Sequence, residues 1–128
     1  MNNFYRIKYN GHRLSSDTFN LEHERCLQFV KKAVSESIAK FKITLTHHVP
    51  TGLCTAPEFR DSLIKGAFTV EFGNYIAESG IDYWIYGHSH RNIDAQIGDT
   101  RVISNQLGYV SSGEHRTNGF DPGRCMIL

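Results

Sequence analysis

Two short apolar runs, each leading into a pair of histidines, constrain the fold of this chain more than any other feature. Residues 41–45 and residues 81–86 have the length and apolar character of buried strands. Four of the seven histidines in the chain follow these runs, namely His47, His48, His88 and His90. Any fold of this chain must therefore place two histidine pairs at the ends of two strands.

The spacing of apolar residues gives an order of elements along the whole chain. Apolar residues that recur every three or four positions predict helices, and short alternating or continuous apolar runs predict strands. In order, the chain contains a strand at 5–9 leading into an Asn-Gly hairpin turn, a helix at 20–40, a strand at 41–45, a helix at 68–79, a strand at 81–86, a hairpin of strands at 93–97 and 100–104, and a strand at 125–128. This order predicts an α/β fold whose mixed sheet is parallel early, antiparallel late, and flanked by helices.

Composition narrows the class of protein. The 128 residues are 40% hydrophobic and 21% charged, with a net charge of +1, as in ordinary globular domains. So little net charge gives no basis for charge-driven nucleic-acid binding. Because no apolar stretch approaches the length of about 18 residues that a membrane span needs, we expect no membrane contact. The three cysteines, Cys26, Cys54 and Cys125, are odd in number and widely spaced, which favours a reducing, cytoplasmic setting.

The positions of the histidines predict a functional site. In open α/β sheets, functional groups collect outside the carboxyl ends of the strands, and neutral imidazoles are good ligands for first-row metals. We expect Gly87 to supply the backbone freedom for a sharp turn beside the second pair. No cluster of carboxylates accompanies the histidines in the sequence. For either pair alone, a solvated loop histidine is the simpler interpretation.

Other histidine chemistries do not fit the spacing. A nucleotidyl-transfer triad of alternating histidines would need a third histidine at position 92, which is Asn92. A phosphodiesterase of the 2′,3′-cyclic type would need two His-x-Ser/Thr units, and a serine hydrolase a Gly-x-Ser-x-Gly elbow. The sequence contains neither pattern.

What remains is His-His-x-Pro at 47–50, followed by Gly-His-x-His at 87–90. This combination resembles the calcineurin-like metallophosphoesterases, which are binuclear metal phosphohydrolases. The resemblance begins near Phe41 and includes residues 98–105 with the Gly-Tyr pair at 108–109. It implies a phosphate mono- or diester as substrate and divalent Mn, Fe or Zn as cofactor. The complete domain would hold two such ions, which this chain alone would bind weakly or not at all.

The resemblance also implies roles for individual histidines. His47 and His88 would bind one divalent ion and His90 the other. His48 would contact substrate or support the metal-binding residues. Asn105 and Tyr109 would lie near the site without touching metal, although packing at a hairpin end explains them equally well. Arg91 would be placed to contact phosphate, but a solvated arginine after a turn is the commoner case.

The sequence departs from the family in one large respect. Three family motifs should precede the histidine pair: Asp-x-His, Gly-Asp-x-x-Asp, and Gly-Asn-His followed by an acid. None of them occurs in the chain. Residues 1–128 therefore resemble a single partial domain, the C-terminal half of the family's four-layer α/β/β/α sandwich. Without the bridging carboxylate and the general acid that these motifs supply, we expect the isolated chain to be inactive or nearly so.

Half of a two-sheet sandwich would expose one sheet edge and one apolar face, and such surfaces favour pairing with another chain. We therefore expect self-association or a complementary chain carrying the N-terminal half. Three hypotheses stay open: a segment of a phosphoesterase, a non-catalytic metal-binding or protein-interaction module with a vestigial site, and histidines that are merely structural.

Overall fold

The computed structural model describes residues 6–55 and 71–127. The chain divides into two compact units, residues 1–37 and residues 38–128. It contains both helices and a mixed β-sheet, so the predicted α/β class is confirmed. No helix among the described residues is long and apolar enough to cross a membrane.

The first unit begins with the hairpin that the Asn-Gly pair predicts. Strands β1 (Lys8–Tyr9) and β2 (His12–Arg13) pair antiparallel. The two turn residues between them, Asn10 and Gly11, both have positive φ, at 48° and 81°. Two successive residues with positive φ match the twist of a tight hairpin, and Asn-Gly tolerates that backbone best.

Helix α2 (Ser16–Glu36) follows this hairpin and is offset from the predicted helix at both ends. It starts four positions before the predicted residue 20 because the hydroxyl of Ser15 accepts a hydrogen bond from the backbone N–H of Thr18. It ends before the predicted residue 40 because Ser37 already has an extended backbone. Ile38, which the periodicity assigned to the helix, is fully exposed beyond it.

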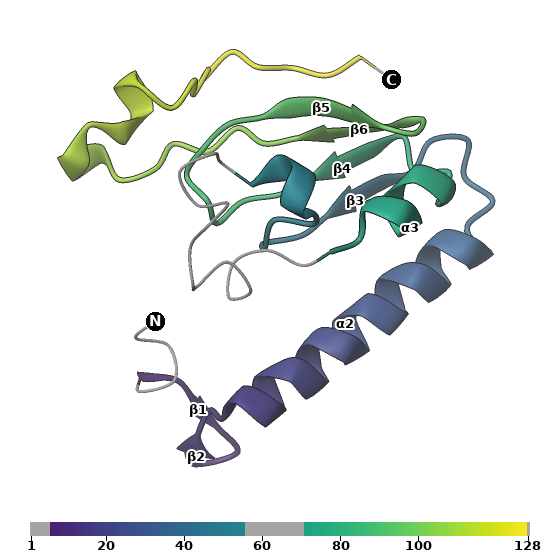
Figure 1. The fold of residues 1–128 in the computed structure, drawn as a ribbon, viewed down its shortest axis with the longest axis vertical. Coiled ribbons are helices and arrows are strands. Elements are labelled where there is room, and N and C mark those ends of the chain that lie inside the picture. The colour runs from purple at the N-terminus through teal and green to yellow at the C-terminus, as the bar shows by residue number, and fades with distance from the viewer. Residues whose placement is uncertain (1–5, 56–70, 128) are drawn as a thin grey trace. The chain divides into compact units, whose positions relative to one another are not determined.

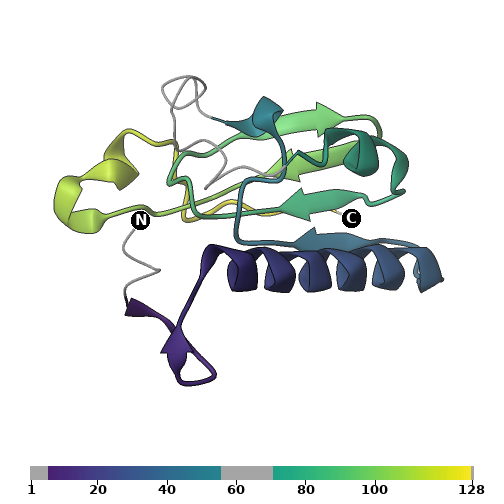
Figure 2. The same ribbon diagram turned by 60° about the horizontal axis from the view of Figure 1, so that its bottom comes forward.

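The second unit is built on a four-stranded sheet in the order β3-β4-β6-β5 (Figures 1 and 2). The strands are β3 (Ile43–Leu45), β4 (Tyr83–Ile85), β6 (Thr100–Ile103) and β5 (Asp94–Ile97). The pairs β3–β4 and β4–β6 are parallel, whereas β5 and β6 form an antiparallel hairpin. The predicted change from parallel to antiparallel pairing is therefore confirmed.

One face of this sheet carries the core. Trp84 and Val102 are paired in register on this face and are almost fully buried. Helix α3 (Gly73–Glu78) covers them, with the ring of Tyr75 edge-on to that of Trp84 and Ile76 completely buried. This helix is shorter than the predicted 68–79: residues 71–72 precede it and are not helical, and 68–70 lie outside the described residues.

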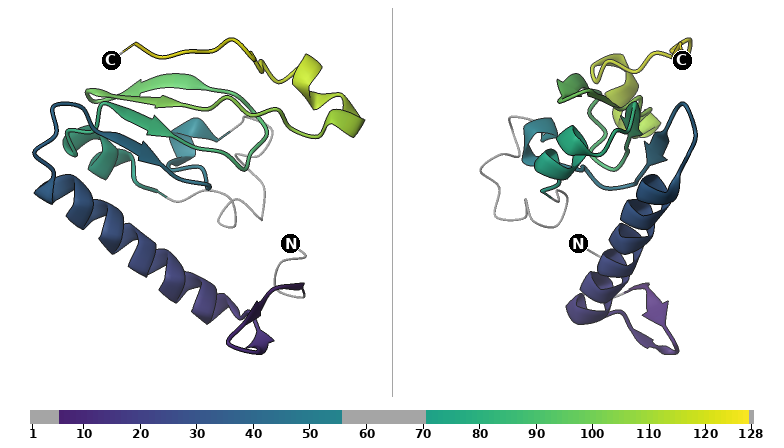
Figure 3. Two further views of the ribbon diagram at one scale, coloured as in Figure 1. Left: turned by 180° about the vertical axis from the view of Figure 1, so that it is seen from behind. Right: turned by 90° about the vertical axis from the view of Figure 1, so that its right-hand side faces the viewer.

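The opposite face carries the C-terminal segment, which was predicted to be a strand at 125–128. That prediction is wrong for residues 125–127, which have no strand pairing, while residue 128 lies outside the described range (Figure 3). Side chains rather than backbone ladders tie the segment to the sheet. Arg124 pairs with Asp94, which also binds Arg101 with both carboxylate oxygens at 2.8 Å, and the Tyr83 hydroxyl donates to the carbonyl of Ile127.

The described residues of the second unit also form three single turns of 3-10 helix: η1 (Gly52–Cys54), η4 (Val110–Ser112) and η5 (Glu114–Arg116). The first of them follows the histidine pair of β3. The other two lie in the polar segment after β6, which the sequence predicted to be a loop.

Candidate metal centre

The candidate site forms where three parallel strands end. Because β3, β4 and β6 run in the same direction, the residues that follow them meet at one edge of the sheet. The β3–β4 pairing continues past the strand ends: Thr46 donates from its backbone N–H to the carbonyl of Ile85, and Gly87 donates to the carbonyl of His47. This extension brings His88 beside His47 and His48.

His47 and His88 are in direct contact. The Nε2 atom of His47 lies 3.0 Å from the Nδ1 atom of His88, and the ring centroids are 4.8 Å apart. Two imidazole nitrogens bound to one tetrahedral zinc ion at 2.0–2.1 Å would lie about 3.3 Å apart. The observed 3.0 Å is the length of a direct hydrogen bond between the two rings, which a shared ion would have to replace.

His88 occupies a strained backbone position. Its φ is 70°, and the N–H of Ser89 donates to the carbonyl of Gly87 across it at 2.9 Å. A hydrogen bond that spans one residue of positive φ marks the rare, strained form of the γ-turn. Gly87 was expected to supply the unusual backbone angle, but it is not among the residues of positive φ, so that expectation is wrong. The strain falls on the histidine because the turn is centred on it, and such strain concentrates at functional sites.

The environment keeps the His88 imidazole neutral. Burial, reinforced by the neighbouring imidazoles of His48, His47 and His90, lowers the pKa of His88 from its usual 6.5 to about 4. A neutral imidazole has a free lone pair at physiological pH, which is the form that binds metal.

His48 is a third member of this group. Its ring centroid is 5.4 Å from that of His47 and 4.8 Å from that of His88. Its backbone is fixed on both sides, because its carbonyl accepts from the Thr46 hydroxyl and Val49 after it is buried. His48 therefore lies beside the His47–His88 pair, where it could contact a ligand.

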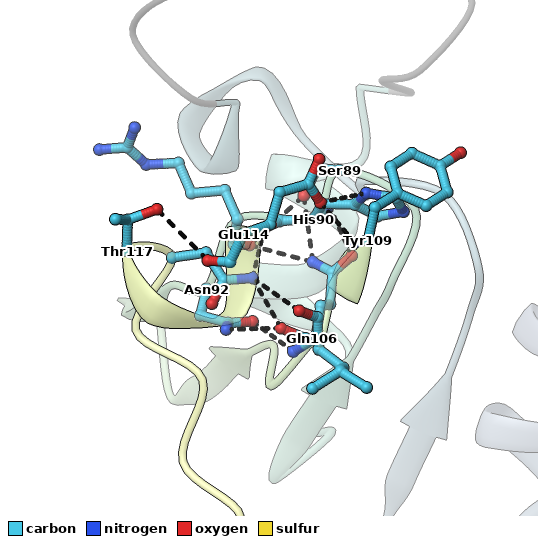
Figure 4. Close-up of polar contacts among 10 residues, drawn as sticks. Ser89, His90, Asn92, Gln106, Tyr109, Glu114 and Thr117 are labelled. Atoms are coloured by element: carbon cyan, nitrogen blue, oxygen red, sulfur yellow. Dashed lines mark hydrogen bonds and ion pairs between the residues drawn. The ribbon is translucent and has the colours of Figure 1, made fainter. Parts of the chain in front are cut away.

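His90 belongs to a second cluster (Figure 4). Its Nδ1 atom is 2.9 Å from Oε2 of Glu114, and its ring packs edge-on against Tyr109 with centroids 4.5 Å apart. Glu114 is a carboxylate that the sequence analysis missed, since it lies 24 positions downstream in a polar loop with no motif around it. Gln106 was missed too; its side chain accepts from the N–H of His90 and donates to Ser89.

The other expected neighbours have different outcomes. Tyr109 lies against His90, as expected. Asn105 instead exchanges two hydrogen bonds with the backbone of Asp121, which is the packing role that the sequence left open. The carbonyl of Arg91 accepts from Ser104 and Gln106, so its backbone helps to close the turn.

No group of three or more His, Cys, Asp or Glu side chains in residues 6–55 and 71–127 is arranged to hold a metal by itself. The three cysteines carry free thiols. Burial, with a smaller effect of Glu71, raises the pKa of Cys54 to about 11, so this thiol stays protonated and is a poor ligand. Any ion at His47 and His88 would need further ligands from water or from another segment.

Comparison with known proteins adds a related sequence but no function. No protein-family model matches the chain, and no solved structure matches it. The chain is similar to an uncharacterized protein of Acanthamoeba polyphaga mimivirus, with 30% identity over 117 residues that span 86% of this chain. The chain covers 40% of the length of that relative.

Proposed function

We propose that this chain is the C-terminal, metal-binding segment of a binuclear phosphoesterase that hydrolyses phosphate mono- or diesters in the cytoplasm. His47 and His88 would hold one divalent ion, Mn, Fe or Zn, and His90 would contribute to a second. His48 would contact the substrate. A bound ion would act as a Lewis acid on phosphoryl oxygens.

The contact between His47 and His88 carries this proposal. Two imidazoles from adjacent parallel strands meet at 3.0 Å, and one of them is held in a strained turn. A structural role does not explain that strain, because a hydrogen bond between two half-solvated rings contributes only about 1 kcal/mol. His90 lies in a separate cluster with its own carboxylate, which supports the assignment of the histidines to two ions.

The segment alone lacks the groups for turnover. Two divalent ions close together need bridging negative charge, and the three motifs that supply it in the family that the chain resembles do not occur in the sequence. We propose that the missing carboxylates come from sequence outside this chain. The greater length of the mimivirus relative supports that view.

The same reasoning extends to the fold. We propose that the sheet is one of two facing sheets in a four-layer α/β/β/α sandwich, completed by a second copy or by a complementary chain. Strand β3 is the outer strand of the sheet and exposes Ile43 and Leu45 on one face, 39% and 71% accessible. Exposed apolar side chains on an outer strand favour such pairing.

The proposal is tested by assaying hydrolysis of p-nitrophenyl phosphate and bis(p-nitrophenyl) phosphate with Mn²⁺ or Zn²⁺. We expect background rates from the isolated chain and turnover when it is mixed with a polypeptide that carries the three absent motifs. The variant His88→Asn should abolish that turnover. Robust turnover by the isolated chain would overturn the claim that it is insufficient. A mixture that binds metal and assembles but does not turn over would favour the non-catalytic binding module.

A further inference from the structure

His90 is fixed by the segment that follows β6. Its N–H donates to Oε1 of Gln106 at 2.8 Å, and its carbonyl accepts from Nδ2 of Asn118 at 2.9 Å. Its φ is 55°, in the left-handed region that non-glycine residues seldom adopt. The backbone N–H and the carbonyl of His90 therefore both form hydrogen bonds that hold its left-handed conformation. That conformation sets the direction of the His90 side chain.

The ring of His90 is fixed by the same segment (Figure 4). Its Nδ1 atom contacts Oε2 of Glu114 at 2.9 Å, and the ring of Tyr109 lies edge-on at 4.5 Å. The carboxylate is itself immobilised, because the same Oε2 atom accepts from the N–H of Tyr109 at 2.7 Å. Gly108 makes room for it: a Cβ there would come within 2.9 Å of the Cβ of Glu114.

The chemistry of this contact decides where the proton of a neutral His90 ring lies. An ionised carboxylate only accepts hydrogen bonds, so the Nδ1 atom of His90 must donate. The lone pair is then on Nε2, the ring nitrogen that Glu114 does not contact. In metal sites a carboxylate on the far ring nitrogen fixes the tautomer in this way and increases the basicity of the ligand.

We propose that Glu114 is a positioning residue for His90: it fixes the ring with the proton on Nδ1 and presents Nε2 to a divalent cation. The part of this inference that assigns a cation to Nε2 rests on the proposed function. The part that assigns the tautomer of His90 does not. Glu114 would touch neither the ion nor the substrate. Its effect passes through the imidazole of His90.

The test is the tautomer of His90 in metal-free protein, read from long-range proton–nitrogen correlations of nitrogen-15-labelled histidine in the presence of a chelator. The His90 signals are assigned with His90→Asn, because asparagine tolerates the left-handed backbone. We expect the proton on Nδ1 in the wild type and largely on Nε2 in Glu114→Ala. Glu114→Gln should restore the wild-type pattern, since its amide oxygen can still accept from Nδ1.

A matched control is Thr117→Val, which changes the same loop without touching the ring, since Thr117 donates only to the carbonyl of Glu114 in the described contacts. It should leave the tautomer unchanged. The inference would be overturned if the wild-type His90 ring carried its proton on Nε2. It would also be overturned if Glu114→Ala left the tautomer unchanged. A tautomer change in Thr117→Val equal to that in Glu114→Ala would overturn it too, because loop disruption would then suffice.

Titration with Zn²⁺ separates this inference from the proposed function. We expect Glu114→Ala to weaken zinc binding at His90 by about 10–100-fold, as for other residues that orient metal ligands. If the tautomer depends on Glu114 but zinc shifts no histidine signal, the positioning stands and the proposed function fails. If zinc binds His90 equally well in wild type and Glu114→Ala, the positioning inference fails while the metal site stands.

Discussion

The Nε2 atom of His47 lies 3.0 Å from the Nδ1 atom of His88, although the two residues are 41 positions apart in sequence. The parallel register of β3 and β4 produces this contact. Leu45 pairs with Ile85, and each histidine follows its strand within three residues. A shift of that register by one residue would turn one histidine to the other face of the sheet and abolish the pair.

The strained turn at His88 gives a prediction about stability. Replacement by Gly and replacement by Ala remove the same imidazole but differ in their tolerance of a φ of 70°. We expect His88→Gly to be more stable than His88→Ala by about 1 kcal/mol, because alanine keeps the left-handed penalty. Urea unfolding of the two metal-free variants measures the difference.

The same pair of substitutions at Ser89, which is not among the residues of positive φ, is the control. There the order should reverse, with alanine the more stable, because glycine loses more chain entropy on folding. An alanine variant at position 88 as stable as the glycine variant would show that the turn stores no strain.

The low pKa of His88 predicts that acid destabilises the metal-free protein. The pKa is about 4 in the folded state and 6.5 ordinarily, so between these values the unfolded chain binds a proton that the folded chain does not. Stability therefore falls as the pH is lowered from 6.5 to 4, by about 1 kcal/mol once the partial exposure of the ring is allowed for. Unfolding midpoints of wild type and His88→Asn at pH 7 and pH 4.5 test this. Identical pH dependence in the two proteins would count against it.

The hairpin of β5 and β6 gives a prediction about the core. Gly98 has a φ of 57°, and a Cβ there would come within 2.6 Å of the carbonyl oxygen of Ala77 in α3. Gly80 has a similar φ of 66° with nothing within 4 Å. We expect Gly80→Ala to cost about 1 kcal/mol for the backbone alone, and Gly98→Ala to cost about 1–3 kcal/mol more. If Gly80→Ala and Gly98→Ala lost the same free energy of unfolding in thermal or urea experiments, helix α3 would move away from the added Cβ at no energetic cost.

Local patterns predicted the second unit well. The Gly-Asp turn indicated the hairpin of β5 and β6, which is observed. The prediction of two buried strands is wrong in part: in β4 only Trp84 is fully buried, and β3 exposes Ile43 and Leu45 because it lies at the end of the sheet. The positions of the histidines at strand ends followed from the same patterns, since parallel strands bring their carboxyl ends together.

What the sequence could not supply depends on contacts between distant residues. Glu114 reaches His90 only because a polar loop folds back over 24 positions, and no local pattern encodes that return. The C-terminal segment has the apolar composition of a strand, but Arg124 and Tyr83 tie it to a sheet face instead of an edge. Propensity cannot predict this placement, because the apolar run at 125–127 is typical of a strand although Met126 and Ile127 are exposed here.

The most direct test of this account is a Zn²⁺ titration of the nitrogen-15-histidine-labelled chain. The account predicts that the ring signals of His47 and His88 shift together, with one midpoint, and that His90 shifts with a separate one. His88→Asn should abolish the shift of His47, whereas His12→Asn in strand β2 of the first unit, the control histidine outside the site, should leave it unchanged. If His47 and His88 ignore zinc, or shift with different midpoints, then the pair does not share an ion and the central claim is wrong.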